Sequence, residues 1–176
     1  LLFMLLPSRV LAFLVVTTLL PMVHSYSHLV VLAHGLAGKA DDLLFLSQSL
    51  MKDESLLVLS TKVNEANSRD GIIAGGKRLA QDVLETIKGH GTLKQISFVG
   101  NSLGGLYVRY CTSLLFEESD GSIAGLEPTH FVTIASPWLG VRFHTFLNVP
   151  HWVSRPLVTL PNGQTGIDLF LDDEGI

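Results

Sequence analysis

Continuously apolar runs alternate along the chain with segments in which apolar residues recur every three or four positions. The apolar runs predict strands that are covered on both faces, as in a parallel sheet. These runs are residues 28–33, 55–60, 96–99 and 131–135. Helical spacing predicts helices over residues 41–50, 73–88 and 106–117. Strands that alternate with helices predict a doubly wound α/β fold, with a mostly parallel sheet and right-handed crossovers.

The first 25 residues have a different character from the rest. Arg9 is the only charged residue before Lys39, and a long apolar stretch follows it. Small residues at Val23 and Ser25 complete the pattern of a secretory signal peptide, or alternatively of a membrane anchor. A buried apolar segment is the other interpretation. We therefore expect residues 1–25 to be a separate segment, which directs the protein to the secretory pathway or a membrane; otherwise the protein is intracellular.

Composition excludes several functions. The chain has 12 Lys and Arg against 16 Asp and Glu, a net charge of -4, and no basic run, so we expect no nucleic-acid partner. Its single cysteine, Cys111, lies in an apolar helical stretch, where a buried, unreactive thiol is expected. Zinc-ligand spacing, a phosphate-binding loop and a dinucleotide fingerprint are all absent from the sequence, so we expect neither a metal nor a cofactor.

The third apolar run leads directly into a reactive motif. Residues 100–104 read G-x-S-x-G, between a predicted strand and a predicted helix. This is the context of a nucleophile elbow, a tight turn that presents a serine at the end of a strand. We predict Ser102 as the nucleophile of an acyl transfer. Gly100, Gly104 and Gly105 would shape the turn, because only glycine lets strand and helix approach so closely.

A serine nucleophile also needs two N–H groups to bind the oxyanion that forms during the reaction. One is the backbone N–H of the residue after the serine, here Leu103. The other comes from the loop after an earlier strand, and the first apolar run ends in His34-Gly35-Leu36. We predict the N–H of Leu36 as the second donor, on a loop shaped by Gly35 and ordered by hydrogen bonds of His34. His34 precedes the serine and lies on the oxyanion side, so it is not the expected base.

The sequence offers no clear candidate for the catalytic acid or for the general base. In this fold the expected order along the chain is serine, acid, then histidine. The residues weighed for these two roles are His130, His144, His151, Asp120, Asp168, Asp172 and Asp173. None of them has the strand-end context that the role requires. We therefore expect the general base and acid to be missing from this chain.

Several motifs, in the same order, resemble the DUF676 family of serine esterases and lipases, a lipase-like α/β-hydrolase domain. They lie at residues 28–36, 70–72, 76–80, 96–105, 123–128, 131–140, 165–166 and 169–171. The resemblance implies an α/β-hydrolase fold for residues 26–176. It also implies a carboxylic-ester hydrolase that acts on acyl lipids through an acyl-enzyme at Ser102, without a cofactor. Asn101 departs from the histidine that the family usually has before the nucleophile.

The family pattern continues to further strands that carry the acid and the histidine. We therefore expect an α/β-hydrolase domain that is incomplete at its C-terminus and inactive by itself. The aromatic residues after Pro137 could form an apolar lid over an acyl chain, or could equally be ordinary core, and they suggest a lipid or membrane surface as a partner. Acylglycerol, phospholipid, thioester and other esters all remain possible substrates. The alternative is a catalytically silent protein that uses this fold for binding.

Overall fold

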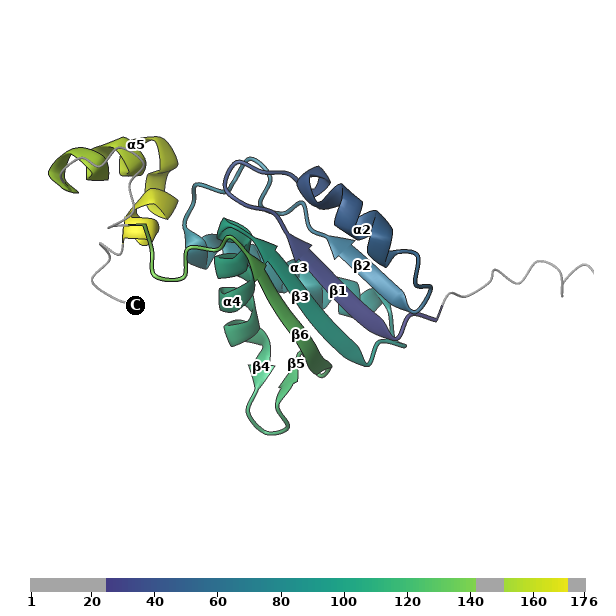
Figure 1. Ribbon diagram of the computed structural model, residues 1–176. Coiled ribbons are helices and arrows are strands. Elements are labelled where there is room, and N and C mark those ends of the chain that lie inside the picture. The colour runs from purple at the N-terminus through teal and green to yellow at the C-terminus, as the bar shows by residue number, and fades with distance from the viewer. Residues whose placement is uncertain (1–24, 142–150, 171–176) are drawn as a thin grey trace, which may run out of the picture.

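The computed structural model describes residues 25–141 and 151–170. Its centre is a sheet of four parallel strands in the order β2-β1-β3-β6 (Figure 1). The strands are β1 (His28–Ala33), β2 (Leu56–Ser60), β3 (Gln95–Asn101) and β6 (Glu127–Ile134). Their parallel pairing, with Leu29 of β1 beside Leu57 of β2 and Ile96 of β3, confirms the predicted α/β fold.

Helices fill the connections between the parallel strands. The short 3-10 helix η1 (Ala40–Leu43) and helix α2 (Leu44–Leu50) lead from β1 to β2. Helix α3 (Ile72–Gly89) leads from β2 to β3, and α4 (Leu103–Leu115) follows β3. Because the strand order reverses at β1, right-handed crossovers place α2 on one face and α3 and α4 on the other, as Figure 1 shows.

Two further elements lie at opposite ends of the sheet (Figure 1). The short antiparallel pair β4 (Phe116–Glu117) and β5 (Ser122–Ile123) projects beyond the amino end of β6. Helix α5 (His151–Phe170), which is kinked at Gly163, lies beyond the carboxyl ends of β3 and β6. No helix within the described residues combines the length and the apolar character needed to cross a membrane.

The main core lies between the sheet and the pair α3 and α4. The helical spacing predicted for α3 brings Leu79 and Val83 into this core, where both are fully buried. Cys111 of α4 packs in the same core, and burial raises the pKa of its thiol to about 12. The thiol is therefore protonated at neutral pH, as expected of an unreactive cysteine.

Strand β6 departs from the prediction. Residues 131–135 were expected to form a buried strand, but β6 is the edge of the sheet, and Phe131, Val132 and Ile134 are 47%, 45% and 45% exposed. Hydrophobic composition alone does not distinguish an edge strand from a central one, because the neighbours are set by the topology. The residues between α4 and β6, for which the apolar pattern predicted neither a helix nor a strand, contain the short strand β5.

Some predictions fall outside the described residues. These are the apolar segment up to residue 24, the aromatic residues Phe143 and Phe146, and the acid and base candidates His144, Asp172 and Asp173.

Candidate active site

The carboxyl ends of three neighbouring strands carry unusual backbone conformations. Ala37 after β1, Ser102 after β3 and Ala135 after β6 have φ angles of 52°, 54° and 51°. Residues with a Cβ atom rarely adopt positive φ, and those that do cluster at functional sites. In parallel α/β sheets, ligands also bind at the carboxyl ends of the strands. Backbone strain and topology therefore identify the same end of the sheet as the candidate site.

Ser102 occupies the sharp turn between β3 and α4. Its φ of 54° and ψ of -121° reverse the chain in a single residue, and helix α4 begins at the next residue, Leu103. The Ser102 N–H donates to the carbonyl of Ile134, 2.7 Å away, which ties the turn to the end of β6. The Ser102 side chain is partly exposed beside the first free N–H groups of α4.

Glycines make this turn possible by close approach rather than by flexibility. A Cβ atom on Gly104 would overlap the backbone carbonyl of Ala33 at the end of β1. A Cβ atom on Gly100 would overlap the backbone of Gly105 in the first turn of α4. Strand and helix could not pack at this distance with any larger residue at either position.

The loop after β1 lies against Ser102. A Cβ atom added to Gly35 would be 3.0 Å from the Cβ and 3.4 Å from the Oγ of Ser102, so the loop backbone and the serine are in contact. The Gly35 carbonyl accepts hydrogen bonds from the Gly38 N–H at 3.1 Å and from Nδ1 of His34 at 2.9 Å. These two bonds fix the plane of the peptide between Gly35 and Leu36. In a trans peptide the N–H points opposite to the carbonyl, so they also fix the direction of the Leu36 N–H.

His34 is a buried hydrogen-bond donor in this arrangement. A carbonyl oxygen can only accept, so the contact with Gly35 assigns the imidazole proton to Nδ1. The side chain is 1% exposed, and its Nε2 atom has no hydrogen-bond partner among the described residues. This geometry supports the predicted role of His34 in ordering the loop.

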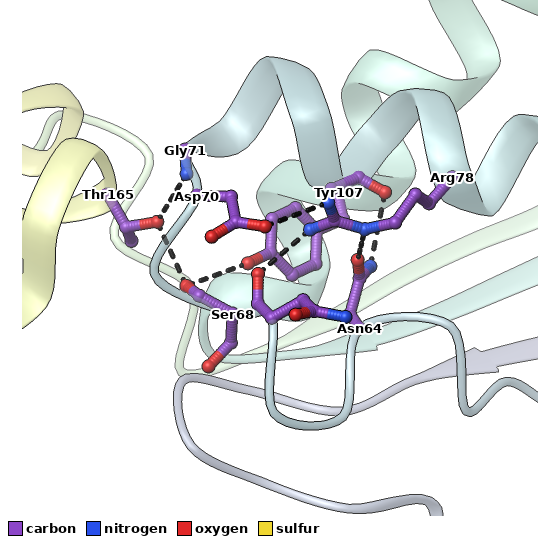
Figure 2. A network of polar contacts seen from close by, with 9 residues as sticks. Asn64, Ser68, Asp70, Gly71, Arg78, Tyr107 and Thr165 are labelled. Carbon is purple, nitrogen blue, oxygen red and sulfur yellow. Dashed lines mark hydrogen bonds and ion pairs between the residues drawn. The ribbon is translucent and has the colours of Figure 1, made fainter.

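A second loop, residues 61–71, supports the first. Ser68 Oγ accepts the N–H of Ala37 at 2.8 Å, and Glu65 Oε1 accepts the N–H of Ala40 at 2.9 Å. Arg78 of α3 holds this supporting loop through Asn64 and the ion pair with Asp70 (Figure 2). These contacts make residues 61–71 a support for the residues beside Ser102.

The second half of α5 docks on the N-terminus of α3 through buried polar contacts. Thr165 Oγ1 accepts the N–H of Gly71 at 2.9 Å, and Asp168 Oδ2 accepts the N–H of Ile72 at 2.7 Å. Helix α3 starts at Ile72 without a capping side chain of its own, so these two α5 side chains supply its cap. Asp168, weighed above as a catalytic acid, is here a helix cap.

Two other candidates, His130 and Asp120, lie toward the amino end of the sheet, and the side chain of His151 lies outside the described part of the chain. His130 lies in the first half of β6, where its Nδ1 is 3.3 Å from Ser97, and Asp120 lies in the turn between β4 and β5 (Figure 1). Within the described residues, no histidine forms a hydrogen bond with Ser102 Oγ. The same residues contain no group of three or more His, Cys, Asp or Glu that could hold a metal ion.

Sequence reasoning missed Ser68, Thr165 and the capping role of Asp168. They act over separations of 31 to 97 residues, which no local pattern reveals. The motifs at 70–72 and 165–166 are far apart in the sequence, and no local pattern indicates that they touch.

Comparison with known proteins gives a consistent set of relatives. The family model described as "Putative serine esterase (DUF676)" matches residues 24–175. The "Putative lipase ROG1" of Saccharomyces cerevisiae is 30% identical over 84% of this chain and 22% of its own length. The "Putative lipase C4A8.10" of Schizosaccharomyces pombe is 32% identical over 82% of this chain and 19% of its own length. The chain thus spans about a fifth of these yeast relatives.

Two bacterial proteins are also similar. "Esterase YbfF" of Escherichia coli is 28% identical over 54% of this chain and 37% of its own length. A solved structure, an extracellular α/β-hydrolase from a Paenibacillus species, matches 49% of this chain and 35% of its own with 20% identity and a TM-score of 0.37.

Proposed function

This chain belongs to the DUF676 family, described as "Putative serine esterase", and from that premise we propose that Ser102 is the nucleophile of a carboxylic-ester hydrolase. Ser102 Oγ attacks the ester carbonyl, the alcohol leaves, and water then hydrolyses the acyl-enzyme. No cofactor takes part in these steps. The observation that carries the proposal is the strained Ser102, which begins α4 and contacts the backbone of Gly35.

The N–H groups of Leu103 and Leu36 are the proposed oxyanion donors. Leu103 opens α4, where the first N–H groups of a helix are free and carry partial positive charge. The Leu36 N–H is oriented by the two bonds to the Gly35 carbonyl. Each donor of this kind typically contributes about 3 kcal/mol to stabilising the transition state.

The base and the acid are the unassigned part of the mechanism. A serine hydroxyl needs a histidine to take its proton and a carboxylate to orient that histidine. No described residue fills either role, so we propose that both come from outside the described residues.

A serine-directed probe tests the proposal in the protein at its full natural length. We expect a fluorophosphonate to label the wild type at Ser102, and Ser102→Ala to abolish both labelling and ester hydrolysis, by about 10⁴-fold or more. Ser97→Ala is the matched control, a second serine on β3 whose loss should leave labelling intact. A wild type that does not label, or a Ser102→Ala variant that still does, would support the alternative, a catalytically silent protein that binds ligands with this fold.

Acyl lipids are the proposed substrate class, because two relatives carry lipase in their names and one is named an esterase. Leu139 and Leu160, which follow β6, are 87% and 82% exposed and could contact an acyl chain or a lipid surface. We expect kcat/KM to rise with acyl-chain length in a series of p-nitrophenyl esters. A preference for acetate over long acyl chains would rule out lipids.

Residues 1–25 are proposed to direct the protein to the secretory pathway or a membrane. A reporter fused to this segment should enter the secretory pathway or the membrane fraction. Retention of the fusion in the soluble cytosol would contradict this proposal.

A further inference from the structure

Ser68 joins three parts of the molecule that are distant in sequence. Its Oγ accepts the N–H of Ala37, in the loop beside Ser102. Its carbonyl accepts the hydroxyl of Tyr107 at 3.1 Å and the hydroxyl of Thr165 at 2.9 Å (Figure 2). Tyr107 lies on α4, the helix that starts at the nucleophile, and Thr165 lies on α5. One buried residue therefore connects the loop after β1, the elbow helix and the docked end of α5.

The bond from Ala37 to Ser68 holds a turn that would otherwise be unfavourable. The hydrogen bond between the Gly38 N–H and the Gly35 carbonyl closes a β-turn with Leu36 and Ala37 at its centre. Ala37, the third residue of this turn, has a positive φ, which is the position that glycine normally takes in a type II turn. Ser68 Oγ binds the N–H of the central peptide and keeps it in this orientation. Without that acceptor, the peptide between Leu36 and Ala37 can turn over and relax Ala37 to negative φ. The turn that carries the Leu36 N–H then keeps only the two bonds to the Gly35 carbonyl.

The backbone of Ser68 is itself fixed by buried hydroxyls. Thr165 is completely buried, and its hydroxyl donates to the Ser68 carbonyl while it accepts the N–H of Gly71. Tyr107 is equally buried, and burial raises the pKa of its phenol, so it remains a neutral donor. Both donors act on one carbonyl and so determine where the Ser68 side chain lies.

We propose that Ser68 is a positioning residue that sets the turn carrying the Leu36 N–H, and that Thr165 couples the docking of α5 to the shape of this turn. The inference rests on the proposed function, since Leu36 is an oxyanion donor only if Ser102 is the nucleophile. Neither Ser68 nor Thr165 touches the substrate in this scheme. They act through the backbone of Ala37 and Leu36, so their loss affects the transition state more than the binding of the ester.

Variants that remove the hydroxyl of Ser68 or Thr165 test the coupling in the protein at its full natural length. Ser68→Ala should lower kcat for a p-nitrophenyl ester by about 10- to 100-fold, with KM changed by less than about twofold, because an oxyanion donor is misplaced. Thr165→Val should lower kcat in the same way but less, and Thr165→Ser, which keeps the hydroxyl, should restore it. The double variant Ser68→Ala/Thr165→Val should be no slower than Ser68→Ala alone, since both act through the same residue.

Matched controls separate this role from a general loss of stability. Ser49→Ala and Thr159→Val each remove a hydroxyl that bonds only to a carbonyl four residues earlier in its own helix. Both should leave kcat unchanged. If Thr165→Val lowers kcat no more than Thr159→Val does, or if Thr165→Ser fails to restore it, the coupling is refuted. Should Ser68→Ala fail to fold, the Thr165 pair decides the question.

Amide hydrogen exchange at Ala37 gives a readout that needs no activity. Ser68→Ala and Thr165→Val should each accelerate exchange at Ala37, while exchange in the core of β3 stays slow. Unchanged protection at Ala37 in both variants would overturn the inference even if the wild type is an active esterase. Faster exchange in a protein that no probe labels would leave the coupling intact and refute only the esterase function.

Discussion

The two ends of the central sheet each present a serine, and the surroundings of these two serines differ in almost every respect. At the amino end, Ser97 lies within β3, with its Oγ 2.8 Å from Nε2 of His28 and 3.3 Å from Nδ1 of His130. At the carboxyl end, Ser102 has no imidazole bonded to it among the described residues. A search for serine and histidine in contact would therefore select Ser97.

The backbone conformation and the surroundings of the two serines instead favour Ser102. Ser97 is 4% exposed and lies within β3, which pairs with β1 on one side and with β6 on the other, so its backbone faces neighbouring strands and not an open site. A register shift in β6 opposite Ser97 turns both Thr129 and His130 toward its hydroxyl, which is thereby saturated. Ser102 is strained, partly exposed and placed at the start of a helix. Solvent exposure and free N–H groups therefore distinguish a candidate nucleophile better than a nearby imidazole does.

Alanine substitution of a glycine should give the largest difference in stability between the two ends of the sheet, because only the carboxyl end has closely packed backbone. At the carboxyl end, Gly104→Ala forces a Cβ atom into the carbonyl of Ala33, and we expect it to lower the free energy of unfolding by about 3 kcal/mol. At the amino end, nothing lies within 4 Å of the Cβ that Gly91→Ala would add, so this control should change stability by less than about 0.5 kcal/mol. Urea unfolding of the two variants measures both values. Equal stabilities would show that the elbow is not tightly packed.

Removing the side-chain cap that α5 supplies to the N-terminus of α3 should lower the free energy of unfolding by an intermediate amount. Asp168→Ala removes the acceptor of the Ile72 N–H, and we expect a loss of about 1–2 kcal/mol in the free energy of unfolding. Asp168→Asn keeps an acceptor and loses only the charge at the helix N-terminus, so it should cost less, about 0.3–1 kcal/mol. Asp53→Ala, an exposed carboxylate at the amino end, serves as the control and should cost less than Asp168→Ala. A loss as large for Asp53 as for Asp168 would contradict the capping role.

The smallest expected effect is a pH dependence of the free energy of unfolding that arises from His28 at the amino end of the sheet. Partial burial and the neighbouring His130 lower the pKa of His28 below its usual value of 6.5, against a weaker opposite influence of Asp53. The folded chain therefore binds fewer protons here than the unfolded chain, and stability is lost as the pH falls through 6.5 toward the lowered pKa. We expect His28→Gln to reduce the loss of unfolding free energy between pH 7.5 and pH 5. An identical pH dependence in wild type and variant would show that His28 contributes nothing to it.

Much of the fold follows from local patterns. The apolar runs of β1, β2 and β3 and the amphipathic spacing of α3 depend only on neighbouring residues, so their bounds in the structure agree closely with the prediction. β6 was found as a strand but misjudged as buried, because its exposure depends on which strands lie beside it. The short pair of β4 and β5 has only two residues in each strand, too few for any periodicity.

The sequence by itself determined the nucleophile candidate, because the G-x-S-x-G motif is a local device whose glycines and serine lie within a single turn. Only the tertiary structure decided what holds that turn in place. Ser68, Thr165 and Asp168 carry no distinguishing pattern, and their contacts span up to 97 residues. Their roles arise from hydrogen-bond geometry between segments that meet only when the sheet forms, and such geometry depends on the path of the whole chain.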